Sequence, residues 1–144
     1  MPRRTILRIV EFFPSSTSFA PIDRKDKEIR KIELKIEELE AMRLKDILGL
    51  SQQDCADKMG ISRQTFQNII DSARYKVAIA LTEGLGIEIR GGDFTSDLCE
   101  LKCNSCNTSY KVKYLKDRFT CPICNSHEVS CQNKNNRCGF WCKR

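Results

Sequence analysis

Apolar residues recur at helical spacing through the middle of the chain, whereas alternation is confined to short segments elsewhere. From Ile36 onward, apolar side chains return every three or four residues as far as Ile47, which predicts a first helix that ends at Gly49. Residues 28–46 carry five basic and six acidic side chains. This balance indicates that the first helix is scaffold and does not lie on phosphates.

Two more helices follow, separated by a short turn. Ser51 opens a capping box and predicts the start of a second helix, which ends at Gly60, because glycine takes a left-handed conformation without steric cost. Ser62 then caps a third helix that ends at Gly84. Its apolar face consists of Phe66, Ile69, Ile70, Ala73, Val77 and Leu81.

Short extended segments flank the helices. Residues 6–13 predict a strand that Pro14 stops, and residues 14–27 predict a loop. Residues 29–34 predict an extended lead-in to the first helix, and residues 87–89 a further short strand.

A short helix, a glycine-containing turn and a capped longer helix together form the helix-turn-helix pattern. In that motif the N-terminal end of the second helix enters the DNA major groove. Arginine can bond two acceptors of guanine, and glutamine or asparagine two groups of adenine, so four polar side chains at this end are expected to contact bases. They are Arg63, Gln64, Gln67 and Asn68. The complete predicted set of DNA-contacting residues adds Ser62, Thr65, Arg74 and Lys76, of which Arg74 and Lys76 are expected to contact phosphates.

The competing interpretation is that these polar residues merely face water, as on many amphipathic helices. The presence of the whole two-helix unit favours DNA binding. Residues 58–76 also carry four basic side chains against Asp71 alone. That local charge suits the phosphate backbone.

The segment GLSQQDCADKMGISRQTFQNIIDSARYKVAIAL resembles the helix-turn-helix of region four of bacterial sigma factors. A longer pattern resembles the uncharacterised protein family 0251, whose members are predicted prokaryotic DNA-binding proteins. That pattern is MPRR at the start, ELEAMRLKDILGLSQQDCADKMGISRQTFQNIIDSARYKVAIALTEG in the middle and IEIRGG at the end. The resemblance covers about residues 1–92 and implies a DNA-binding role.

Eight of the nine cysteines lie in the last 46 residues, and they give the strongest chemical signal of the chain. Two CxxC pairs are separated by 14 residues, and two such turns complete a tetrahedral shell for zinc. An iron–sulfur cluster is the competing occupant. The predicted ligands are Cys103, Cys106, Cys121 and Cys124.

The residues around the two pairs fit a zinc ribbon. Asn107 and Asn125 follow the pairs at positions where a left-handed residue is often needed, and asparagine tolerates that conformation. Residues 110–114 alternate between polar and apolar and suit a strand of a hairpin.

Three further thiols suggest a second metal site. Cys131, Cys138 and Cys142 need a fourth ligand, for which Cys99 and His127 are the two candidates. Cys99 is favoured because a fourth thiolate matches the other three in softness. The remaining thiol, Cys55, is expected to be a small buried apolar residue, with a redox sensor as the alternative.

Net charge and composition limit the function classes. The charge of +6 suits a polyanionic partner without requiring one. A zinc ion with four thiolates carries −2, which weakens the basic excess of residues 93–144 as evidence for nucleic-acid contact. We expect a cytoplasmic protein that does not bind membranes, because no apolar run approaches the ~20 residues that span a bilayer. A single histidine and the lack of a phosphate-binding glycine loop argue against an enzyme.

The sequence therefore predicts a mainly α protein with a helix-turn-helix at about residues 51–83 and short flanking strands. The expected division is a DNA-binding domain at 1–92, a linker at 93–98 and a zinc-ribbon-like β module at 99–144. The expected function is sequence-specific binding of double-stranded DNA in transcription regulation, with zinc as cofactor. RNA polymerase or another protein is a further candidate partner, and a homodimer is one option. The alternatives are a metal- or redox-responsive regulator that uses the second cysteine cluster, and a protein-interaction adaptor.

Overall fold

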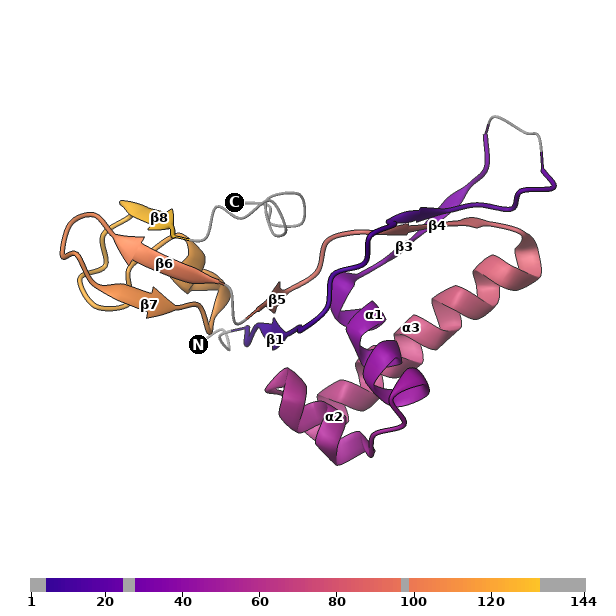
Figure 1. The fold of residues 1–144 in the computed structure, drawn as a ribbon, viewed down its shortest axis with the longest axis horizontal. Coiled ribbons are helices and arrows are strands. Elements are labelled where there is room, and N and C mark those ends of the chain that lie inside the picture. The colour runs from indigo at the N-terminus through magenta and orange to yellow at the C-terminus, as the bar shows by residue number, and fades with distance from the viewer. Residues whose placement is uncertain (1–4, 25–27, 97–98, 133–144) are drawn as a thin grey trace. The chain divides into compact units, whose positions relative to one another are not determined.

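The computed structural model describes residues 5–24, 28–96 and 99–132 (Figure 1). The chain divides into two compact units. The helical unit comprises residues 12–92. The cysteine unit comprises residues 1–11 together with residues 93–144.

The first helix of the helical unit begins and ends where the sequence predicts. Helix α1 spans Ile36–Met42 and continues as a π-helical turn, η1, at Arg43–Ile47. The wider turn arises because the Leu48 N–H donates to the Arg43 carbonyl, five residues earlier, at 3.0 Å. Gly49 then ends the helix with a φ of 69°.

Helices α2 (Gln52–Met59) and α3 (Arg63–Glu83) have the predicted caps. The hydroxyls of Ser51 and Ser62 each accept a hydrogen bond, at 3.1 Å, from the backbone N–H three residues later. Gly60 takes the predicted left-handed conformation, with a φ of 67°. Residues 60–62 thus form the short turn between the two helices.

The core of the helical unit lies where α1, α2 and α3 meet. The cluster comprises Ala41, Leu44, Cys55, Ala56, Met59, Phe66, Ile69 and Ile70. The predicted apolar face of α3 is therefore correct over its first part, and Cys55 is a buried apolar residue as expected. At the far end the prediction is wrong, because Leu81 is 77% exposed and Ala80 is buried instead.

A three-stranded sheet completes the helical unit. Strand β4 (Gly86–Ile89) lies between β3 (Lys31–Leu34), to which it is parallel, and β2 (Ser18–Phe19), to which it is antiparallel. The C-terminal part of α3 packs against β3 and β4. Strand β2 lies in the segment predicted to be a loop.

The cysteine unit is built from five short strands. Strands β1 (Arg8–Ile9) and β5 (Phe94–Thr95) form a parallel pair. Strand β6 (Glu100–Cys103) lies between β7 (Ser109–Lys111) and β8 (Val129–Cys131), antiparallel to both. A 3₁₀ turn, η2, occupies Leu115–Arg118.

The N-terminal segment belongs to the cysteine unit, although the sequence assigned it to the helical domain. The Leu7 N–H donates to the Lys113 carbonyl at 3.1 Å, and Ile6 forms a β-bridge with Tyr114. The Leu7 side chain is buried with Leu101 and Val112. The predicted boundary near Gly92 agrees with the division into units, but residues 1–11 fall on the other side of it.

The predicted mainly α fold class is wrong. The described residues contain three α-helices and eight strands in three small sheets. The strands are two to four residues long, too short to show a clear period of two in the sequence. Most strands pair with segments that are far away in the chain. Local patterning therefore predicted the helices, but it predicted fewer strands than the structure contains.

Candidate functional site

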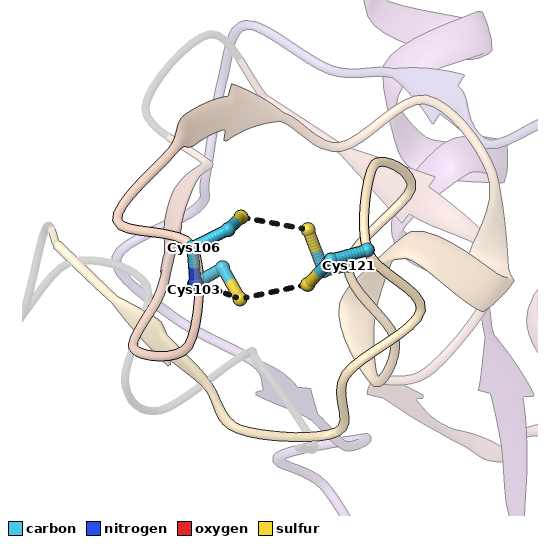
Figure 2. A group of neighbouring side chains, drawn as sticks. Cys103, Cys106 and Cys121 are labelled. Atoms are coloured by element: carbon cyan, nitrogen blue, oxygen red, sulfur yellow. Dashed lines mark hydrogen bonds between the residues drawn. The ribbon is translucent and has the colours of Figure 1, made fainter.

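Four cysteines of the two CxxC pairs converge in the cysteine unit. Their sulfur atoms all lie within 4.8 Å of one another. The Sγ atoms of Cys103 and Cys124 are 3.5 Å apart, and those of Cys106 and Cys121 are 3.7 Å apart. Figure 2 shows Cys103 and Cys106 on one turn with their sulfurs facing Cys121 on another. The arrangement brings together the residues that the sequence selected as a metal site.

The backbone of the two turns explains this convergence. In the first turn, the Cys106 N–H donates to Cys103 Sγ at 3.5 Å. In the second turn, the Asn125 N–H donates to the Cys121 carbonyl at 2.9 Å. Asn107 and Asn125 have φ angles of 58° and 61°, which confirms the left-handed conformation expected after each pair. Each turn therefore aims two sulfurs at a common point.

The sulfur geometry fits a single tetrahedral ion. A zinc–sulfur bond of about 2.3 Å places tetrahedral ligands about 3.8 Å from one another. The Cys103–Cys124 and Cys106–Cys121 sulfur separations, 3.5 and 3.7 Å, are close to this value. They are far longer than the ~2.0 Å of a disulfide, so the four groups are free thiols. The donor set of four thiolates suits a soft or borderline metal ion.

The thiols of the cluster have unequal proton affinities. Side-chain and backbone hydrogen bonds with Thr108 lower the pKa of Cys106 to about 6. The Ser126 N–H favours the Cys124 thiolate, but the neighbouring thiols and burial outweigh it and raise the Cys124 pKa to about 12. Four thiolates at one point repel one another, and a divalent cation between them would relieve this repulsion.

The second predicted metal set is only partly within the described residues. Cys131 lies opposite Leu101, so Cys99 and Cys131 are on the same face of the β6–β8 pair. Both thiols are half-buried and pack against the Leu7 cluster. His127 is exposed, and its Nδ1 lies 3.3 Å from the Thr120 hydroxyl. Cys138 and Cys142 lie outside the described residues.

Six of the eight predicted DNA-contacting residues, all except Arg74 and Lys76, lie at the N-terminal end of α3. Arg63, Gln64 and Asn68 are exposed. Ser62 and Thr65 form the cap, with their hydroxyls 2.9 Å apart. The helix beyond them is 21 residues long, and its buried side is fixed against the core. The cap and the core together give these polar side chains a rigid base.

The two predicted phosphate-contacting cations already form ion pairs. Lys76 Nζ lies 2.6 Å from Glu38 Oε1, and the Glu38 side chain is only 3% exposed. Arg74 pairs with Asp46 at 2.6 Å, which raises the pKa of Arg74. Lys76 thus compensates a buried carboxylate of α1, and Arg74 links α3 to η1.

Sequence patterning missed Gln52, the first residue of α2. Its side chain accepts a hydrogen bond from Arg63 Nε at 3.1 Å and donates to Gln67 Oε1. Gln67 in turn donates to Asp71 at 2.7 Å. The helix-turn-helix pattern points to the start of the longer helix alone and gives no signal for a partner on the preceding helix.

No helix in the described part of the chain combines the length and apolar character that crossing a lipid bilayer requires.

The fold and the cysteine cluster define a two-unit protein with a candidate four-thiolate metal centre in one unit.

Comparison with known proteins places the chain in a family. It belongs to the UPF0251 proteins, and residues 1–97 match the family described as "Protein of unknown function DUF134". It is 57% identical over 143 residues to a UPF0251 protein of Clostridium botulinum strain Hall, which covers 99% of this chain and 91% of the relative. A UPF0251 protein of Clostridium tetani is 54% identical over 143 residues, covering 99% of this chain and 97% of the relative. No solved structure matches significantly.

The resemblance to family 0251 is therefore confirmed. It also extends further than expected, because the relatives align over the cysteine unit as well as residues 1–92.

Proposed function

We propose that this protein binds double-stranded DNA in a sequence-specific manner through the N-terminal end of α3, and that it regulates transcription by doing so. In this proposal α2, the turn and α3 act as a helix-turn-helix. The role is binding and not catalysis. The supporting observation is the exposed group Arg63, Gln64 and Asn68 at a capped helix start, next to a tight turn.

The shape and charge of this end suit the major groove. The groove admits one α-helix, and α3 is long enough to enter it with its first turn while the remainder stays on the core. The first backbone N–H groups of a helix also favour an anion such as a phosphate. No carboxylate lies in the first turn of α3 to repel one.

The roles within the predicted set can now be divided. Arg63, Gln64 and Asn68 are the proposed base-contacting residues. Gln64 donates to Asn68 at 3.1 Å, which leaves the carbonyl oxygen of Gln64 and the amino group of Asn68 for a base edge. Lys76 is proposed as a structural residue because it pairs with Glu38. The ion pair between Arg74 and Asp46 offsets the charge of Arg74 and weakens its attraction for a phosphate.

For the cysteine unit we propose a structural zinc ion bound by the four clustered cysteines. Two ligands of one ion at about 2.3 Å lie at most about 4.6 Å apart, and the cluster falls close to that limit. A multi-iron cluster would need more room between the thiolates. Zinc would neutralise part of the thiolate charge and join the two turns, which otherwise share the 2.8 Å contact between the Ser105 and Ser126 hydroxyls.

The metal proposal predicts the stoichiometry of purified, reduced protein. Elemental analysis should find at least one zinc per chain. A second zinc would support the set that contains Cys99 and Cys131. Iron in place of zinc would contradict the proposed occupant.

The DNA proposal is tested by selection from a library of random duplexes with the full-length chain. We expect enrichment of a defined sequence, and an affinity for the selected duplex at least tenfold above that for a scrambled one. Arg63→Ala should remove about 1–3 kcal/mol of this preference. Arg90→Ala is the matched control. Arg90 is an exposed cation of the same unit, directly after strand β4, and it pairs with Glu33. Failure to enrich any sequence would contradict the proposal.

A further inference from the structure

We infer that Gln52 is a positioning residue, which holds the Arg63 guanidinium for base contact from the preceding helix. The inference deepens the proposed DNA-binding function and rests on it. It is carried by a continuous chain of side-chain hydrogen bonds between α2 and α3, here called the amide relay. Its members, in order, are Arg63, Gln52, Gln67 and Asp71.

The direction of every bond in the amide relay is fixed by its two ends. Asp71 can only accept, so Gln67 must present its NH₂ to Asp71 and its carbonyl oxygen to Gln52. Gln52 must then donate to that oxygen, which turns its own oxygen toward Arg63. Arg63 can only donate. A flip of either amide would set two donors or two acceptors against each other.

The amide relay leaves the two terminal amino groups of Arg63 available for base contact. Within the described residues, the side-chain hydrogen bonds of Arg63 involve only Nε, with Gln52 at 3.1 Å. The two terminal amino groups stay free to form the paired hydrogen bonds by which arginine recognises guanine. A side chain anchored at Nε loses less conformational entropy on binding than a free one. Gln52 is therefore expected to raise affinity for the preferred sequence without touching a base.

The amide relay also reassigns Gln67. The sequence predicts Gln67 as a base-contacting residue, but both ends of its amide are used, one by Gln52 and the other by Asp71. Gln67 is half-buried, unlike Gln64 and Asn68, which are exposed. Its inferred role is to orient Gln52, and Arg63 through it.

The experiment uses the full-length chain and the duplex enriched by selection with the wild type, with a scrambled duplex as the reference. Gln52→Leu should lower affinity for the selected duplex about 3- to 10-fold and leave the scrambled duplex within twofold. Gln53→Leu is the matched control. Gln53 neighbours Gln52 on α2 and is exposed, and among the described residues its side chain bonds only to Asp57 of the same helix. It should leave both affinities unchanged.

A double-mutant cycle separates positioning from a general structural role. If Gln52 acts through Arg63, the variant with both Gln52→Leu and Arg63→Ala should bind the selected duplex within twofold of Arg63→Ala alone. Gln52→Glu gives a second test, because a carboxylate still accepts from Arg63 but cannot donate to Gln67. The Gln52→Glu variant should also show a smaller preference for the selected duplex over the scrambled one.

Three results would overturn the inference. Equal behaviour of Gln52→Leu and Gln53→Leu, or losses that multiply in the double variant, would remove the positioning role and leave the DNA-binding function intact. If the wild type enriches no duplex, the proposed function fails, and the inference fails with it.

Discussion

The helical unit buries eight apolar residues in one cluster around Phe66 and Met59, whereas the corresponding cluster of the cysteine unit buries only Leu7, Leu101 and Val112 among the described residues. A cluster of three side chains offsets little of the entropy lost on folding. The cysteine unit instead brings four thiols to one point. Together with the proposed zinc site, the comparison leads us to expect that packing stabilises the helical unit and that metal ligation stabilises the cysteine unit.

Loss of the proposed zinc ion should have the largest effect on stability, and only on the cysteine unit. Structural zinc in small domains supplies about 10–16 kcal/mol, so Cys106→Ser or a strong chelator should unfold residues 99–132 while the helices persist. Zinc content and far-UV circular dichroism check both outcomes. Cys55→Ala is the control, since Cys55 is buried in the core of the helical unit and its loss should leave the proposed zinc in place.

The reciprocal change removes apolar packing from the helical unit. Phe66 is fully buried, so Phe66→Ala should destabilise that unit by about 3–5 kcal/mol. The zinc content should stay the same. Tyr75→Ala, on the same helix but 65% exposed, should cost less than about 0.5 kcal/mol. Chemical denaturation measures these differences, and loss of zinc in Phe66→Ala would show that the two units do not fold independently.

A third change tests whether the N-terminal strand belongs to the cysteine unit. Leu7→Ala should cost about 2–5 kcal/mol of that unit's stability and speed the release of zinc to a chelator. Ile6→Ala should have little effect, because Ile6 is 40% exposed. Unchanged zinc release in Leu7→Ala would count against the strand's role and favour the sequence-based division of the chain.

The smallest effect concerns Lys76. Its removal leaves the Glu38 carboxylate buried without its cation, so Lys76→Ala should destabilise the helical unit by about 1–3 kcal/mol. Arg74→Ala breaks an exposed pair and should cost less than about 1 kcal/mol. The salt dependence of DNA binding should not change in Lys76→Ala. A lower slope at unchanged stability would restore Lys76 as a phosphate-contacting residue.

Local signals in the sequence located the helices and the cysteine cluster. Ser51, Ser62 and Gly60 determine helix ends through their own backbone and side-chain chemistry, so their positions could be predicted without a tertiary structure. The same holds for the CxxC turns with Asn107 and Asn125.

Features that depend on distant pairing could not be predicted in this way. Strand β2 has two residues, and its pairing with β4 joins segments about 70 positions apart. The sequence places Leu7 in the first domain, whereas the hydrogen bond between Leu7 and Lys113 assigns it to the cysteine unit. Gln52 carries no motif, because its role depends on the turn that brings it next to Arg63.

We propose that α3 of the helical unit contacts DNA and that a metal ion stabilises the cysteine unit. Nuclear magnetic resonance of the ¹⁵N-labelled, zinc-loaded full chain, titrated with the selected duplex, tests it most directly. The account predicts the largest amide shift changes at residues 62–68 and at Gln52, with small changes in residues 99–132. Changes confined to residues 99–132, with residues 62–68 unaffected, would contradict it.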